Sequence, residues 1–182
     1  KLFTNLSLKR KFAKNFNLLP ITENLIDKIY KDKSKKTISS FYNLDNKISG
    51  EAASSKINRL IKIMKSKKIH NIFISASENV AWLLNIRGKD NPNSPIPNCK
   101  IILTNTKKIF FFSCPKKINI IKKHHDHKKI TFCTYLDFSK IINKLKGSNF
   151  SIDSSTCSVS NESLIRTFFN IKFNVDPCYI LK

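Results

Sequence analysis

Apolar side chains recur at helical spacing between residues 51 and 66. The apolar positions there are Ala53, Ile57, Leu60, Ile61 and Met64. Residues three, four and seven apart lie on one face of an α-helix, and a helix in a globular protein buries such a face. We therefore predict an amphipathic helix over this segment, packed against the rest of the fold.

Short apolar runs bounded by polar or turn-forming residues predict the strands of a sheet. They span residues 71–75, 100–104, 109–113, 130–135, 149–153 and 171–175. Only Asn105-Thr106-Lys107 and Lys108 separate the second run from the third, which favours a β-hairpin turning at that point. The run Ile109-Phe110-Phe111-Phe112 is typical of a strand covered on both faces.

Further helices are predicted between these strands. Ser75 and Glu78 have the spacing of a capping box, so a helix is expected over residues 77–84. Pro115 suits the first turn of a helix running towards Lys123, and Asp137 can cap another. Two more apolar stripes mark helices; they consist of Phe138, Ile141, Ile142 and Leu145, and of Leu164, Ile165, Phe168 and Phe169. Helices alternating with strands predict a three-layer α/β fold, with helices on both faces of a mixed, mostly parallel sheet.

The segment 31–49 is polar, rich in Lys, Ser and Asn, and shows no clear period, so we place a domain boundary there. Residues 1–48 then form the end of a preceding unit plus a linker, and residues 49–182 form the α/β domain. In the first part, Leu2, Leu6, Phe12 and Phe16 can line a helix, residues 16–21 favour a short strand, and residues 24–30 favour one or two helical turns. The chain begins at Lys1 rather than Met, and we interpret it as a segment of a longer polypeptide.

The formal net charge is +22, which suggests a nucleic acid or an anionic membrane as a partner. Of the 34 basic residues, however, only Arg10, Arg59, Arg87 and Arg166 are arginines. Nucleic-acid surfaces favour Arg, and abundant Lys, Asn and Ile together indicate a biased codon composition. We therefore expect no dedicated nucleic-acid surface, and keep a free-standing basic module for nucleic acid as the alternative function.

Five widely spaced cysteines form no CxxC pair, which favours reduced thiols in a cytoplasmic protein over a zinc or redox site. No apolar run reaches ~18 residues, so no membrane span is expected. The sequence also lacks GxGxxG, GxxxxGK[ST] and GxSxG motifs, which disfavours nucleotide binding and an esterase-like nucleophile.

Three features could support chemistry, and each also has a structural interpretation. His124-His125-Asp126-His127 contains metal-ligand residue types, but it lies among lysines where a solvated loop is expected. Asp153 ends a predicted strand and precedes Ser154-Ser155, which also suits an Asx turn. Cys157 has no obvious His partner, which a nucleophilic role would require.

Charged residues also follow the buried helix 77–84, in the segment Asn85-Ile86-Arg87-Gly88-Lys89-Asp90. From composition alone, this is a helix end with a surface contact between Arg87 and Asp90. The whole stretch Ser77 to Asp90 nevertheless resembles the pattern D-E-I-A-W-L-x-N-x-R-G-x-D in the middle domain of the long, three-domain Xaa-Pro aminopeptidases (aminopeptidase P). A proline-bearing loop containing Asn93-Ser94-Pro95 and then the hairpin follow here, as they do in that family.

Weaker matches to the same family lie in the same order along almost the whole chain. They are Pro20 to Tyr30 (P-x-x-x-N-L-V-D-x-I-W), Gly50 with Lys56 and Ile57 (G-x-S-x-x-x-K-[IV]), Ile152-Asp153, and Cys178 to Lys182 (S-P-I-x-x-L-K). Tyr30, Asn79 and Cys178 depart from the family pattern, which suggests a divergent member.

The resemblance implies a creatinase-like fold and a role in a larger enzyme. Such enzymes remove the residue that precedes a proline at the second position of a peptide. They use two divalent metal ions, often manganese, in a C-terminal pita-bread domain. This segment is then a non-catalytic N-terminal or middle domain without a cofactor or metal of its own, which shapes substrate access and contacts in a homo-oligomer. We expect Asn85, Arg87, Gly88 and Asp90 to form a fixed polar turn that faces the catalytic domain or a neighbouring subunit.

Overall fold

The structure, a computed structural model, describes residues 41–91, 93–118 and 130–182, together with Phe12, Phe16, Glu23 and residues 25–29. The predicted helix face with Leu2 and Leu6, the strand over 16–21, the helix beyond residue 118 and the His124–His127 run lie outside the described residues. The short helix α2 (Leu25–Ile29) lies within the predicted helical turns.

Six strands form one sheet in the order β6-β5-β4-β2-β7-β8. Their bounds are β2 (Asn71–Ile74), β4 (Lys100–Thr104), β5 (Ile109–Ser113), β6 (Ile130–Thr134), β7 (Asn149–Ile152) and β8 (Asn170–Phe173). The pairs β2–β7, β7–β8 and β5–β6 are parallel, whereas β4 is antiparallel to both β2 and β5. The predicted hairpin is thus confirmed, and it is what makes a mostly parallel sheet mixed.

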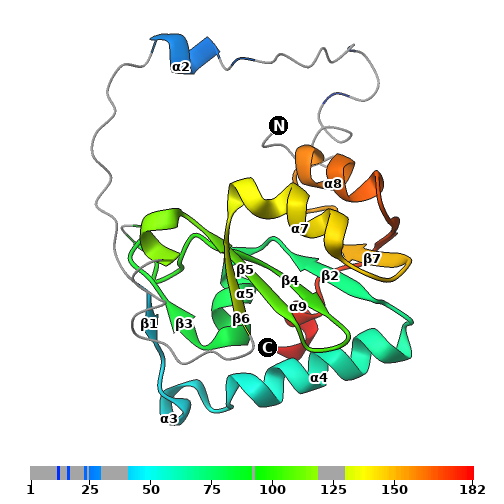
Figure 1. Cartoon of the computed structure of the whole chain (residues 1–182). Helices are drawn as coiled ribbons and strands as arrows, with labels where there is room; N and C mark the ends of the chain where they lie inside the picture. The colour runs from blue at the N-terminus through cyan, green and yellow to red at the C-terminus, as the bar shows by residue number, and fades with distance from the viewer. Residues whose placement is uncertain are drawn as a thin grey trace.

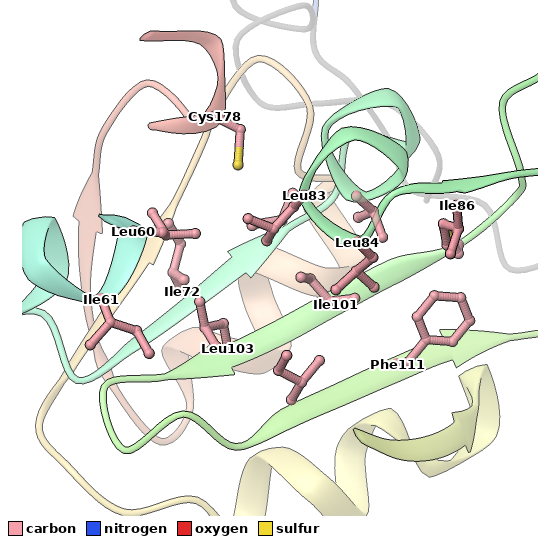
Figure 2. Packing of buried hydrophobic residues seen from close by; sticks show 14 of the residues in the cluster. Leu60, Ile61, Ile72, Leu83, Leu84, Ile86, Ile101, Leu103, Phe111 and Cys178 are labelled. Atoms are coloured by element: carbon pink, nitrogen blue, oxygen red, sulfur yellow. The ribbon is translucent and has the colours of Figure 1, made fainter. Parts of the chain in front are cut away.

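One face of the sheet is covered by α4 (Ala53–Ser66) and α5 (Ser77–Leu84). Figure 2 shows Leu60 of α4 and Leu83 of α5 pointing towards Ile72, Ile101 and Leu103 on the strands. The apolar stripe predicted for residues 51–66 is therefore the buried face of α4. The short helix α9 (Cys178–Leu181) completes this layer, because the Cys178 side chain belongs to the same core.

The opposite face is covered by α7 (Phe138–Lys144) and α8 (Val159–Arg166), which lie above the sheet in Figure 1 while α4 lies below it. Phe73, Ile102 and Phe150 point to this side and pack with Phe138 and Ile165. Because neighbouring strand residues alternate between the two cores, both faces of the central strands are apolar. The three-layer α/β fold expected from the sequence is confirmed.

A second, two-stranded sheet pairs β1 (Tyr42–Asn43) with β3 (Ile86–Arg87), and neither strand was predicted. It brings the segment that precedes α3 (Asn46–Ser49) against the end of α5. Phe41 is buried there, 5.5 Å from the Phe111 ring in an edge-to-face arrangement. Residues 41–44 therefore pack directly on the α/β domain.

Two predicted helix caps are wrong. The residue before α5 is Ala76, and Ser75 instead shares a hydrogen bond of 2.7 Å with Thr156. Asp137 stands at the N-cap position of α7 but makes no capping hydrogen bond there; its carboxylate accepts hydrogen bonds from the backbone and hydroxyl of Thr134, which precedes the 3-10 helix η1 (Tyr135–Asp137). Over the described residues, no helix is both long and apolar enough to cross a bilayer.

Candidate functional site: the turn after α5

Asn85 ends α5 in the left-handed conformation, with φ 53° and ψ 40°. Its backbone N–H is directed at the carbonyls of Ala81 and Trp82, which closes the last turn of the helix. Asn tolerates this conformation better than other residues with a β-carbon, so it suits a helix end that carries no Gly. The chain then leaves α5 directly into β3.

The Asn85 side chain holds a buried lysine. The Lys56 Nζ donates to Asn85 Oδ1 over 2.6 Å and to the Trp82 carbonyl over 3.0 Å, and it lies 4.7 Å from the Trp82 ring centroid. The Asn85 amide donates in turn to the Glu51 carbonyl over 2.8 Å. Burial lowers the pKa of Lys56, because desolvation disfavours the charged form. These contacts join the beginning of α4 to the end of α5.

Arg87 is half-buried, and its guanidinium donates to two backbone carbonyls, those of Ala81 (3.2 Å) and Ile86 (2.8 Å). Its backbone pairs with Tyr42 of β1. Among the ion pairs of the described residues there is none between Arg87 and Asp90, so the contact expected from composition is wrong. Arg87 instead binds backbone carbonyls at the end of α5 and in β3.

Gly88 allows two segments to approach closely. A β-carbon at this position would lie 2.8 Å from the Pro97 Cβ and 3.4 Å from the Phe41 ring. Its N–H donates to the Pro95 carbonyl over 3.0 Å, which closes the proline-bearing loop. Any side chain at Gly88 would push the loop and the Phe41 ring apart.

Asp90 turns inward and forms a buried ion pair with Lys117. The second carboxylate oxygen accepts from the Asn98 backbone N–H over 2.6 Å. Lys117 also lies 4.8 Å from the centroid of the Phe41 ring. The pair therefore fastens the loop that follows β3 to the segment after β5, with Phe41 as the third partner.

The four predicted site residues thus share one turn, but their side chains have separate partners. Asn85, Gly88 and Asp90 face inward and hold neighbouring segments, whereas Arg87 retains partial exposure. The arrangement contains no nucleophile with an adjacent base. Its direct chemical consequence is rigidity, since buried hydrogen bonds and an ion pair fix both ends of the turn.

The other candidates have structural partners as well. Asp153 accepts from the Ser155 backbone N–H (2.8 Å) and hydroxyl, which confirms the Asx-turn interpretation. Cys157 is fully buried, and burial raises the pKa of its thiol to about 12, so it is a poor nucleophile. Within the described residues, no group of three or more His, Cys, Asp or Glu side chains could hold a metal ion.

The sequence did not reveal a second buried polar cluster beside the turn. Asp176 accepts from the Asn79 amide (2.6 Å) and from the Cys178 N–H (2.9 Å), while Asp153 accepts from the Asp176 N–H (2.9 Å). These bonds fix α9 to α5. The Asp176-Pro177 dipeptide was the available signal, since an acid followed by proline commonly begins a helix.

Comparison with known proteins agrees with this fold. The family profile described as the Creatinase/Prolidase N-terminal domain matches residues 32–182. A probable Xaa-Pro aminopeptidase P of Laccaria bicolor is 30% identical over 120 residues, which cover 65% of this chain and 19% of that protein. An Xaa-Pro aminopeptidase of Caenorhabditis elegans is 28% identical over 122 residues, which cover 67% of this chain and 20% of that protein.

Solved structures share the architecture. An X-prolyl aminopeptidase of C. elegans, described as a cytosolic enzyme with a di-nuclear active site, superposes with a TM-score of 0.72 at 23% identity, over 84% of this chain and 26% of that one. A proline dipeptidase structure from Streptococcus agalactiae matches 71% of this chain and 99% of its own with a TM-score of 0.52 at 13% identity. The chain spans only about a fifth of the length of the two curated relatives. With the profile match over most of its length, the chain belongs to the creatinase/prolidase N-terminal domain family.

Proposed function

We propose that this chain is the non-catalytic N-terminal or middle domain of an Xaa-Pro aminopeptidase-like metallopeptidase of the cytoplasm. The profile match over residues 32–182 carries the proposal, together with relatives that are Xaa-Pro aminopeptidases, of whose length the matched residues cover only 19% and 20%. Residues 1–48 then comprise the end of a preceding domain and its linker, of which residues 41–44 pack on the α/β domain. The activity, removal of a residue before proline, belongs to the whole enzyme.

The two divalent metal ions of such an enzyme, manganese in our proposal, are not assigned to this chain. Its described residues do not fit them, because no cluster of three metal-ligating side chains is present among these residues. A pita-bread catalytic domain in the rest of the enzyme would supply the ligands. This chain would act through its surfaces, by shaping access of the peptide and by contacting a neighbouring subunit.

The turn from Asn85 to Asp90 is the part of the domain we assign to these contacts. Asn85, Gly88 and Asp90 act as positioning residues, because their inward bonds hold the turn in one conformation. Arg87 is a partly exposed cation of the turn, and two carbonyl acceptors hold its guanidinium in place. A fixed cation at the border of another domain can orient a peptide carboxylate or an acidic neighbour.

The test is Arg87→Ala in the full-length enzyme. We expect kcat/KM for a peptide with proline at the second position to fall about tenfold, or the oligomer to dissociate at a higher protein concentration than the wild-type oligomer does. Arg166→Ala is the matched control, since Arg166 is an exposed arginine on α8, paired with Glu162. Wild-type turnover and wild-type assembly in the Arg87 variant, with the melting temperature unchanged, would refute the role of the turn but leave the family assignment intact.

A further inference from the structure

Lysines are concentrated along one edge of the six-stranded sheet, namely the side on which β2, β7 and β8 begin and β4 ends. Four segments meet there: residues 65–70 before β2, residues 105–108 between β4 and β5, residues 144–148 before β7, and residues 167–172 at the start of β8. They contain no Asp or Glu. Their basic residues, which we call the lysine edge, are Lys65, Lys67, Lys68, Lys107, Lys108, Lys144, Lys146 and Lys172.

The opposite edge of the sheet differs in charge. The segments that begin where β2, β6, β7 and β8 end, or that lead into β4, contain acids; these are Glu78, Asp137, Asp153, Asp176 and Asp90. A biased codon composition raises the number of lysines, but it does not sort acids to one edge of a fold. Asp90, Asp153 and Asp176 have the buried structural partners described above, so what distinguishes the lysine edge is that no acid in its own segments offsets its charge.

Hydrogen bonds join the four segments into one surface. Asn105 donates its N–H to the His70 carbonyl over 2.9 Å, and Asn71 donates its amide to the Lys146 carbonyl over 3.0 Å. Asn149 reaches the Lys68 carbonyl over 3.1 Å, and the Asn170 N–H donates to the Ser148 carbonyl over 3.0 Å. The lysines therefore project from backbone that is held in register, so little backbone entropy is lost when a partner binds.

Seven of the eight lysines are exposed, and Lys172 is half-buried with its Nζ on the Lys67 carbonyl at 3.3 Å. None of the ion pairs of the described residues involves them. Like charges gathered without acids create a positive potential over the whole edge. In Figure 1 the end of α4, the tip of the β4–β5 hairpin and β7 lie towards the right-hand side of the molecule.

Contrary to the expectation from composition that the chain has no dedicated nucleic-acid surface, we propose that the lysine edge binds the phosphate backbone of double-stranded nucleic acid without reading its sequence. Strands lie about 4.8 Å apart, so the edge from β4 to β8 is about 15 Å wide, over which a duplex presents about nine phosphate charges. Exposed Ser66, Thr106 and Ser148 can donate to phosphate oxygens between the lysines. Phe168 is the one exposed aromatic side chain in the four segments, too few for base stacking or membrane insertion.

The test compares two variants of the 182-residue chain that lose the same four charges. One carries Gln at Lys67, Lys68, Lys107 and Lys108 of the edge; the control carries Gln at the exposed lysines Lys47, Lys116, Lys140 and Lys182. The probe is a mixed-sequence 20-bp duplex, followed by fluorescence anisotropy from low to physiological salt. Because the substitutions are at exposed positions, both variants should melt like the wild type.

The edge variant should bind the duplex at least about tenfold more weakly. The slope of its log binding constant against log salt concentration should be smaller in magnitude by about three to four, because up to four phosphate contacts are lost. The control should stay within about threefold of the wild type. Equal weakening of both variants would overturn the proposal, since charge alone would then explain binding. Tighter binding of the wild-type chain to phosphatidylserine vesicles or to a poly-glutamate peptide than to the duplex would also overturn it.

Discussion

At the scale of single residues, Asn85 determines how the end of α5 meets α4. Replacing Asn85 by Gly keeps the left-handed backbone conformation but removes the side-chain oxygen that accepts from the Lys56 Nζ over 2.6 Å. Lys56 is only 2% exposed. A buried cation would then keep one carbonyl acceptor. We expect Asn85→Gly to lower the free energy of unfolding by about 3 kcal/mol, measured by urea denaturation.

The control for this prediction removes the charge. Lys56→Met in the Asn85→Gly background should cost much less than Lys56→Met in the wild type, because the cation that lacks its acceptor is already destabilising. Additive effects of the two substitutions would show that the loss comes from other contacts of the Asn85 side chain, such as its bond to the Glu51 carbonyl, and not from Lys56.

Two glycines with positive φ separate backbone strain from steric conflict. A β-carbon at Gly147 (φ 106°) would lie 2.5 Å from the His70 Cβ, whereas one at Gly50 (φ 74°) would meet nothing within 4 Å. Gly50→Ala should therefore cost about 1 kcal/mol, the strain of a left-handed alanine. Gly147→Ala should cost clearly more by thermal or urea unfolding, since His70 must move as well; equal losses would contradict the clash.

At the scale of elements, the bond between Asp176 and Asn79 docks α9 on α5. Burial raises the pKa of Asp176, so the folded state binds the proton of this carboxyl group more tightly than the unfolded state does. The resulting stabilisation is complete below the unfolded pKa, about 3.9, and is lost as pH rises through the folded value. We expect Asp176→Asn to gain stability relative to the wild type between pH 4 and 7, measured by urea denaturation at each pH.

The geometry supports this outcome, because the Asn79 Oδ1 is buried without a hydrogen-bond partner. If the Asn79 amide flips, its Oδ1 can accept from the side-chain amide that the substitution introduces at position 176. Asp137→Asn is the matched control with the opposite sign. The hydrogen bond from the Thr134 backbone lowers the pKa of Asp137, so that variant should lose stability relative to the wild type as pH rises. The same trend in both variants would contradict the assignment.

Elements with a strong period were predictable, and short ones defined by distant partners were not. The stripe on α4 carries its own local signal, because burial of one face imposes the period. The runs of β2, β4 and β5 carry theirs because burial on both faces makes them continuously apolar. The two-residue strands β1 and β3 have no such period, since they form only when segments about 40 residues apart meet. The Ser75–Glu78 cap failed for a similar reason: Thr156 and Tyr179 compete for those side chains from distant positions.

At the scale of the whole molecule, the candidate site could be located from sequence but not described. The motif from Asn85 to Asp90 points to this turn as a candidate, because a charged segment after a buried helix is visible in the local sequence. Its partners Lys56, Phe41 and Lys117 lie far away in sequence, so the inward direction of Asn85 and Asp90 was not predictable. The charge segregation of the lysine edge was hidden for the same reason, since four separate loops create it.

The extent of the folded unit can be tested by shortening the chain. The boundary predicted from sequence lies between residues 48 and 49, yet Phe41 is 6% exposed in the core and the Leu44 N–H donates to the Asn85 carbonyl over 2.7 Å. A chain of residues 49–182 lacks both contacts, whereas one of residues 41–182 keeps them. We expect the free energy of unfolding of the 49–182 chain to be about 4 kcal/mol lower than that of the 41–182 chain, mainly because a buried phenylalanine is lost. Phe41→Ala in the 182-residue chain should reproduce most of that loss, and equal denaturation midpoints for the two shortened chains would favour the boundary at residue 48.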